Sequence, residues 1–185
     1  MAVYNRPMRK VILSFGMSLD GYIARPDGAV DFLVNDADAR KIMAEFFATI
    51  DTAIMGRKTL DDAIRMMGGT YKAPVQLETY VLSRSLAPGK FEGYEVVRNP
   101  TALVEELRRR PGKHIFNMGG GELGRSFLEA DLVDELFLGI VPVLLGAGRP
   151  AFPGGFPQRE FRLTEHRAFS GSSVLLRYER CRIGS

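Results

Sequence analysis

Thr52-Ala53-Ile54-Met55-Gly56-Arg57-Lys58-Thr59 joins a short apolar run to a polar turn. The run at 51–55 predicts a buried strand, and residues 59–66 predict a helix. A glycine, two cations and a hydroxyl therefore lie at a strand-to-helix corner, where free backbone N–H groups and the helix dipole favour a phosphate. The pattern is not a Walker A loop, because Arg57 interrupts its Gly-Lys-Thr order. The alternative interpretation is an ordinary solvated helix start.

A second corner of the same kind is Asn117-Met118-Gly119-Gly120-Gly121-Glu122-Leu123, between a predicted strand and a predicted helix. Residues 119–124 match G-x-G-x-x-G, yet a Rossmann fingerprint also expects an acid at the end of the next strand. Here Asp134 and Glu135 stand at its start. The glycines still let the backbone approach a pyrophosphate closely, although packing alone is the alternative. Two such corners predict a nucleotide with more than one phosphate group.

A third polar turn, Ser83-Arg84-Ser85, follows a predicted strand at 78–83. Ligands of parallel sheets bind at the carboxyl ends of the strands. Together with Arg57 and Lys58, this turn could surround a phosphate monoester such as the 2′-phosphate that distinguishes NADP from NAD. A solvent-facing turn is the alternative.

Composition indicates one globular domain of 185 residues with a net charge of only +3, too small to argue by itself for nucleic-acid binding. The Arg108-Arg109-Arg110 run is interpreted as the solvated end of a helix. Cys181 is the single cysteine, so no intrachain disulfide is possible, which fits a reducing cytoplasm. We find no signal peptide and no apolar segment of roughly 20 residues. Residues 1–7 are expected to be an extension of a single domain at 8–185.

The element pattern predicts a mostly parallel α/β sheet, because the first strands mostly alternate with helices. The final two strands, separated by 169–173, predict an antiparallel hairpin at the sheet edge. Asp36 or Asp38 is expected to cap the first helix, and Thr101 the third. We expect strands at 10–17, 51–55, 78–83, 94–98, 114–118, 135–142, 160–168 and 173–180, and helices at 36–49, 59–66, 101–110 and 122–130.

Three acids are candidates for catalysis. Asp20 leaves the first strand in an Asp-Gly turn, and turn formation is its alternative role. Asp36 and Asp38 open the first helix, where either can cap it or hold the ring nitrogens of a substrate. No metal site is expected, because neither histidine has a metal-ligand pattern around it. The absence of H-x-E with C-x-x-C also excludes a zinc deaminase.

In order and spacing, these segments resemble the dihydrofolate reductase fold over nearly the whole chain from Met8. They are most similar to the branch of the C-terminal reductase domain of the bifunctional riboflavin-biosynthesis deaminase-reductase. The segments that carry the resemblance are Val11–Ser14 with Met17–Ala24, Asp51–Thr59, Val81–Arg84, Asn117–Gly121 and Val133–Gly148.

The resemblance implies a three-layer fold and an NADPH-dependent reductase. It implies that the Asp20 loop closes over the nicotinamide and that the acid of the first helix maps best near Asp38. Unlike classical dihydrofolate reductases, the chain has no tryptophan. The cofactor-binding residues that it implies are Gly56, Arg57, Lys58, Thr59, Leu82, Ser83, Arg84, Met118, Gly119, Gly120, Gly121, Glu122 and Leu123.

The expected activity is hydride transfer from NADPH to a small heterocycle. The first choice of substrate is a ribosylamino-pyrimidinedione phosphate, as for 5-amino-6-(5-phosphoribosylamino)uracil reductase. A dihydrofolate or pteridine substrate is the second choice, and a non-catalytic nucleotide-binding protein is the alternative of another class. We expect a cytoplasmic homodimer that binds neither nucleic acid nor membrane, since the apolar strand at 136–145 and the C-terminal hairpin offer an edge for a second copy.

Overall fold

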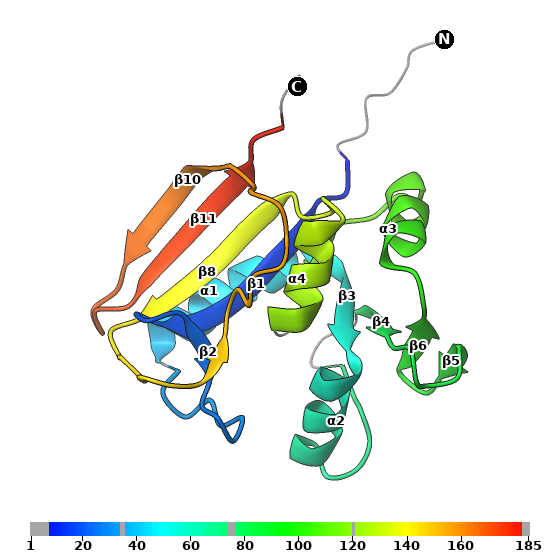
Figure 1. Cartoon of the computed structure of the whole chain (residues 1–185), viewed down its shortest axis with the longest axis horizontal. Coiled ribbons are helices and arrows are strands. Elements are labelled where there is room, and N and C mark those ends of the chain that lie inside the picture. Colours follow the sequence, from blue (N-terminus) through cyan, green and yellow to red (C-terminus); the bar gives the residue numbers. More distant parts are fainter. Residues whose placement is uncertain (1–7, 34–35, 74–76, 120, 183–185) are drawn as a thin grey trace.

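The computed structural model describes residues 8–33, 36–73, 77–119 and 121–182. Over these residues a nine-stranded sheet forms the centre of the molecule (Figure 1). Strands β2 (Tyr22–Ala24) and β9 (Arg149–Pro150) form a separate pair. The order across the main sheet is β10 (Phe161–Ala168), β11 (Val174–Arg180), β8 (Glu135–Val141), β1 (Val11–Ser18), β7 (His114–Asn117), β3 (Ile50–Gly56), β4 (Glu78–Leu82), β6 (Tyr94–Val97) and β5 (Gly89–Phe91).

The sheet is parallel from β8 through β6 and antiparallel at its margins. β1, in the interior of the sheet, pairs in parallel with both β7 and β8. β11 runs antiparallel to β8 and to β10, so the predicted C-terminal hairpin at the sheet edge is confirmed. At the opposite margin β5 runs antiparallel to β6. The mixed α/β class with a mostly parallel sheet is therefore confirmed.

Helices cover both faces of the sheet and create the three predicted layers. Helix α1 (Ala37–Ala48) lies behind the sheet in Figure 1, and α3 (Pro100–Arg109) and α4 (Gly121–Glu129) lie in front of it. Helix α2 (Arg57–Met66) packs through Leu60 on Met55 of β3, which faces away from α3. None of the helices in the described ranges is long and apolar enough to cross a bilayer.

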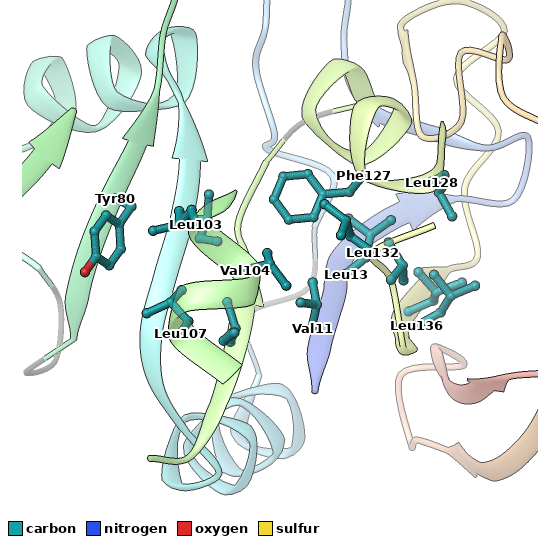
Figure 2. Close-up of a cluster of buried hydrophobic side chains, with 14 residues drawn as sticks. Val11, Leu13, Tyr80, Leu103, Val104, Leu107, Phe127, Leu128, Leu132 and Leu136 are labelled. Carbon is teal, nitrogen blue, oxygen red and sulfur yellow. The ribbon is translucent and has the colours of Figure 1, made fainter. Parts of the chain in front are cut away.

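The core between the sheet and helices α3 and α4 is built from aliphatic side chains of alternate strand residues. Figure 2 shows Val11 and Leu13 of β1 against Val104 of α3 and Phe127 of α4, and all four side chains are fully buried. On the other face, Phe46 of α1 stacks on Phe137 with ring centroids 4.7 Å apart. Burying about 150–250 Å² for each aromatic ring makes these contacts a large share of the fold's stability.

Local signals explain most of the helix boundaries, with one correction. Asp36 caps α1 as predicted, because its carboxylate accepts a hydrogen bond from the Ala39 amide. The predicted Thr101 cap of α3 is wrong. Asn99 is the cap, accepting from the Ala102 amide, and Pro100 occupies the first turn. Proline suits that position because its missing N–H would have no helical partner there.

Candidate active site

The carboxyl ends of the parallel strands form one edge of the sheet, and the three polar turns predicted from the sequence meet there. Gly56 ends β3, Ser83 follows β4 and Met118 follows β7. Since β7, β3 and β4 are consecutive in the sheet, the three turns stand side by side. The structure thus brings together candidate residues that are up to 67 positions apart in the chain, from Gly56 to Leu123.

The Gly56 corner presents an open helix start. Gly56 is the N-cap of α2 in extended backbone conformation, and no side chain caps the helix. A methyl group on Gly56 would meet no atom within 4 Å, so neither packing nor backbone conformation demands the glycine. Arg57 and Lys58 are exposed, with Arg57 at 3.7 Å from Asp61, and Thr59 is half-buried. The free amides and two cations form a cradle suited to an anion.

At the Ser83 turn the hydroxyl has a structural role. It accepts hydrogen bonds from the amides of Ser85 (3.2 Å) and Leu86 (3.0 Å), while half-buried Leu82 packs on the core. Arg84 is exposed. The sequence analysis missed Arg98, which follows β6 and donates to the Ser83 carbonyl at 2.7 Å. Its position directly after a strand, like that of Arg84, was the available signal.

The glycine corner after β7 is partly explained by packing. A side chain at Gly119 would collide with Leu123, and one at Gly121 would approach the Pro150 carbonyl oxygen to 2.5 Å. Glu122 is exposed and pairs with Arg125 at 3.3 Å. Met118 is half-buried, and Gly120 lies outside the described residues.

Asn117, at the end of β7, has an unsatisfied donor. Its side chain is fully buried, and its Oδ1 accepts from the Gly119 amide at 3.0 Å. Its Nδ2 has no hydrogen-bond partner among the described residues. Buried amide donors are normally paired, and a group bound at the sheet edge could supply the missing partner.

A cavity of about 330 Å³ opens beside this edge, between α1 and the strands β1, β8 and β11. Its floor includes Gly16 and Gly139, which are partners in the register of β1 and β8. The space above Gly139 is open, whereas Leu33 packs over Gly16. Its walls are apolar and include Ile42, Phe116, Phe137, Phe169 and Leu175. A volume of this size, with few polar groups, suits a small planar ring.

Three polar side chains line the cavity: Ser14, Asp36 and Ser173. Asp36 reaches it from the start of α1. Asp38, to which the resemblance mapped the helix acid, does not line it. Instead, Asp38 accepts a hydrogen bond at 3.3 Å from Ser170 in the β10–β11 turn. Of the two helix acids, Asp36 is therefore placed to contact a bound ring.

Asp20 ties two segments together outside the cavity. Its carboxylate accepts from the Ser18 hydroxyl (2.6 Å) and from the amides of Leu145 (3.1 Å) and Gly146 (2.7 Å). The Ser18 hydrogen bond is the main reason that the pKa of Asp20 lies below its ordinary value of 3.8. In the part of the chain that the structure describes, no group of three His, Cys, Asp or Glu side chains could hold a metal ion.

The three-layer architecture with a mostly parallel central sheet is the dihydrofolate reductase-like fold. The chain belongs to the RibD C-terminal domain family, whose model matches residues 9–175. The family and its structural neighbours indicate a reductase-like protein.

Known relatives cover almost the whole chain. The "Uncharacterized protein YwjB" of Bacillus subtilis is 32% identical over 93% of this chain and 98% of its own. A crystal structure named "Putative riboflavin biosynthesis protein", from Shewanella sp. PV-4, superposes with a TM-score of 0.82 at 25% identity, covering 94% of this chain and 99% of that one. Dihydrofolate reductase from Enterococcus faecalis, complexed with NADP(H), has a TM-score of 0.66 at 18% identity, with 94% and 97% covered, and shares the fold.

Proposed function

We propose that the protein is an NADPH-dependent reductase that transfers hydride to a small nitrogen heterocycle held in the cavity beside α1. The observation that carries the proposal is the adjacency of two differently built sites. Phe116 of β7 lines the apolar cavity, and the next residues, Asn117 to Gly119, form part of the anion-binding edge. A ring in the cavity would thus lie next to a cofactor bound along the edge.

The residues present fit a phosphorylated dinucleotide. The open start of α2 and the unpaired Asn117 amide suit the pyrophosphate and its neighbouring groups. Arg57, Lys58 and Arg84 supply exposed cations for a 2′-phosphate. When bound, NADPH would supply the hydride, as expected from the cofactor recorded in the E. faecalis reductase.

The protein's own contribution would be orientation and exclusion of water. The phenylalanine walls would keep solvent from the ring, and the Asp36 carboxylate would accept a hydrogen bond from a ring N–H. Asp20 and Asp38 would act through the segments that they hold in place. We propose a ribosylamino-pyrimidinedione phosphate as the first substrate to test and a dihydropteridine as the second.

Calorimetric titration with NADPH and, separately, NADH tests the cofactor assignment. Replacing both Arg57 and Lys58 by alanine should lower the affinity for NADPH at least about tenfold, because charged hydrogen bonds to the 2′-phosphate are lost. The affinity for NADH should change little. The matched control, Arg109→Ala with Arg162→Ala, removes the same charge from exposed positions away from the carboxyl edge. Equal losses for both cofactors would defeat the 2′-phosphate assignment.

Oxidation of NADPH in the presence of a candidate heterocycle separates a reductase from a nucleotide-binding protein without catalysis. We expect the absorbance of the reduced nicotinamide to fall only when the heterocycle is present. Tight NADPH binding without turnover of either proposed substrate class would favour the non-catalytic alternative.

A further inference from the structure

The hydroxyl of Ser173 is the least explained polar group of the cavity. Ser173 lines the cavity, yet its Oγ is buried and has no hydrogen-bond partner among the described residues. A buried hydroxyl without a partner destabilises the folded chain, and such groups are rare in folded proteins. The reductase edge described above does not use this residue. Its position therefore points to a partner that arrives with the ligand.

The turn between β10 and β11 places Ser173 against α1. The turn is closed by hydrogen bonds from the Phe169 amide to the Ser173 carbonyl and from the Ser172 amide to the Phe169 carbonyl, each 3.0 Å. A methyl group on Gly171 would lie 3.4 Å from Oδ2 of Asp36, so the turn packs directly on the helix start. Asp36 and Ser173 thus enter one cavity from neighbouring walls.

The two side chains offer complementary chemistry. A carboxylate only accepts hydrogen bonds, whereas a hydroxyl with a free proton can donate one. A ring that presents an N–H beside a carbonyl, a lactam edge, would satisfy both at once. A ring without the carbonyl would leave the Ser173 hydroxyl unpaired.

We propose that Ser173 is a substrate-binding residue that donates to a ring carbonyl while Asp36 accepts from the adjacent ring N–H. The proposal rests on the proposed function, since it takes the cavity as the substrate site. It deepens that function by assigning the substrate to lactam-bearing nitrogen heterocycles and by giving the C-terminal hairpin a role in recognition.

Two small probes test the pairing without any turnover. Isocytosine carries a ring N–H beside a ring carbonyl, and 2-aminopyrimidine has neither of these two groups. NMR titrations of the full chain with each probe give their dissociation constants. Ser173→Ala should raise the dissociation constant of isocytosine about tenfold, because one buried hydrogen bond is lost. The dissociation constant of 2-aminopyrimidine should stay within about twofold of the parent value.

Two further variants make the result specific. Ser173→Thr keeps the hydroxyl and should retain isocytosine binding. Thr164→Val removes a hydroxyl from the same hairpin, where it bonds the Arg177 carbonyl, and should bind both probes as the parent chain does. Equal weakening of both probes by Ser173→Ala, no weakening, or no isocytosine binding by the parent chain would each overturn the proposal.

The outcomes distinguish a failure of the reductase proposal from a failure of the Ser173 proposal. If isocytosine binds and responds to Ser173→Ala while NADPH neither binds nor is oxidised, the Ser173 assignment stands and the reductase proposal falls. If NADPH binds with the expected preference while the probe pair shows no difference, the reverse holds.

Discussion

At the scale of single residues, Gly139 shows how part of the cavity floor stays open. Glycine weakens a strand because it brings no side chain and loses more conformational freedom on folding. Gly16 and Gly139 are in register on adjacent strands, so both lower the stability of the sheet. A methyl group on Gly139 would meet only the Gly16 Cα, at 3.8 Å, so the position tolerates a side chain.

This tolerance makes Gly139→Val a clean test of the cavity. Valine suits a strand and its methyl groups would fill the floor. We expect the dissociation constant of isocytosine, measured by NMR titration, to rise at least about tenfold. NADPH affinity should stay unchanged, and the thermal midpoint of unfolding should stay unchanged or rise. Unaltered isocytosine affinity would mean that the ring binds elsewhere.

Single residues also mark the limit of prediction from sequence. The Gly56 and Gly119 corners were predictable because glycines closely follow apolar runs, with two cations beside Gly56, and this pattern is local. Arg98 and Ser173 were not predicted. Arg98 stands directly after a strand, but its bond to the Ser83 carbonyl depends on β6 lying beside β4, and Ser173 lines the cavity because the hairpin turn packs against α1. Both facts are set by tertiary pairing between distant segments. Asp36 could be chosen over Asp38 only once the cavity was known.

At the scale of elements, the eight longer strands and four helices were predicted to within about two residues, because each has an apolar run or a periodic pattern over at least four residues. The strands β2, β5 and β9 were missed. They have only two or three residues each, too few for a periodic signal, and β2 forms only by pairing with β9. The error at Thr101 arose because Asn99 and Thr101 are both good cap residues.

Asp20 precedes β2, and its carboxylate holds the segment that precedes β9 through the amides of Leu145 and Gly146. These hydrogen bonds can be tested directly. Because the pKa of Asp20 lies below 3.8, the carboxylate's hydrogen bonds persist above that value and are lost as the pH falls through the lowered pKa. The amide resonances of Leu145 and Gly146 should therefore titrate with a midpoint below 3.8.

Asp20→Asn should abolish this titration of both amides. Asp27→Asn, which alters the carboxylate that caps the Ala29 amide in the neighbouring loop, should leave it unchanged. A midpoint at or above 3.8 in the parent chain would show that the tie is not formed in solution.

At the scale of the whole molecule, His114 links global stability to pH. It starts β7 beside β1, where its Nδ1 accepts from the Lys10 amide at 3.2 Å. Burial lowers its pKa from 6.5 in the folded chain, so the unfolded chain binds the proton first. Stability is therefore complete above pH 6.5 and decreases as the pH falls from 6.5 toward the lowered pKa.

Urea unfolding at pH values of about 7.5, 6.5 and 5.5 checks this dependence. We expect the free energy of unfolding to fall across the series in the parent chain and to fall less in His114→Gln. The other histidine, His166, is exposed on β10, so His166→Gln should keep the parent slope. If the pH dependence of the free energy of unfolding instead disappeared in His166→Gln, the effect would belong to His166 and the assignment to His114 would be wrong.

The assembly of the protein is also a whole-molecule question, and we propose a homodimer. Strand β10 is one edge of the sheet, and its Leu163 is 46% exposed. Unpaired backbone groups on such an edge are a template for a second copy. Light scattering at micromolar concentration should give twice the 20.5 kDa of one chain, and Leu163→Lys should lower that mass. A monomer at this concentration would reject the proposal.

The central position of β1 also governs how the chain emerges from a ribosome. Strand β1 is translated early, but its two neighbours begin only at His114 and Glu135. At roughly 5–20 residues per second, its unpaired backbone edges wait on the order of 5–20 seconds for a partner. During that wait the nascent segment Val11–Ser18 is an unpaired apolar strand, the kind of sequence that chaperones shield from aggregation. Synthesis speed and chaperone supply, more than final stability, should therefore limit the yield of folded protein in a cell.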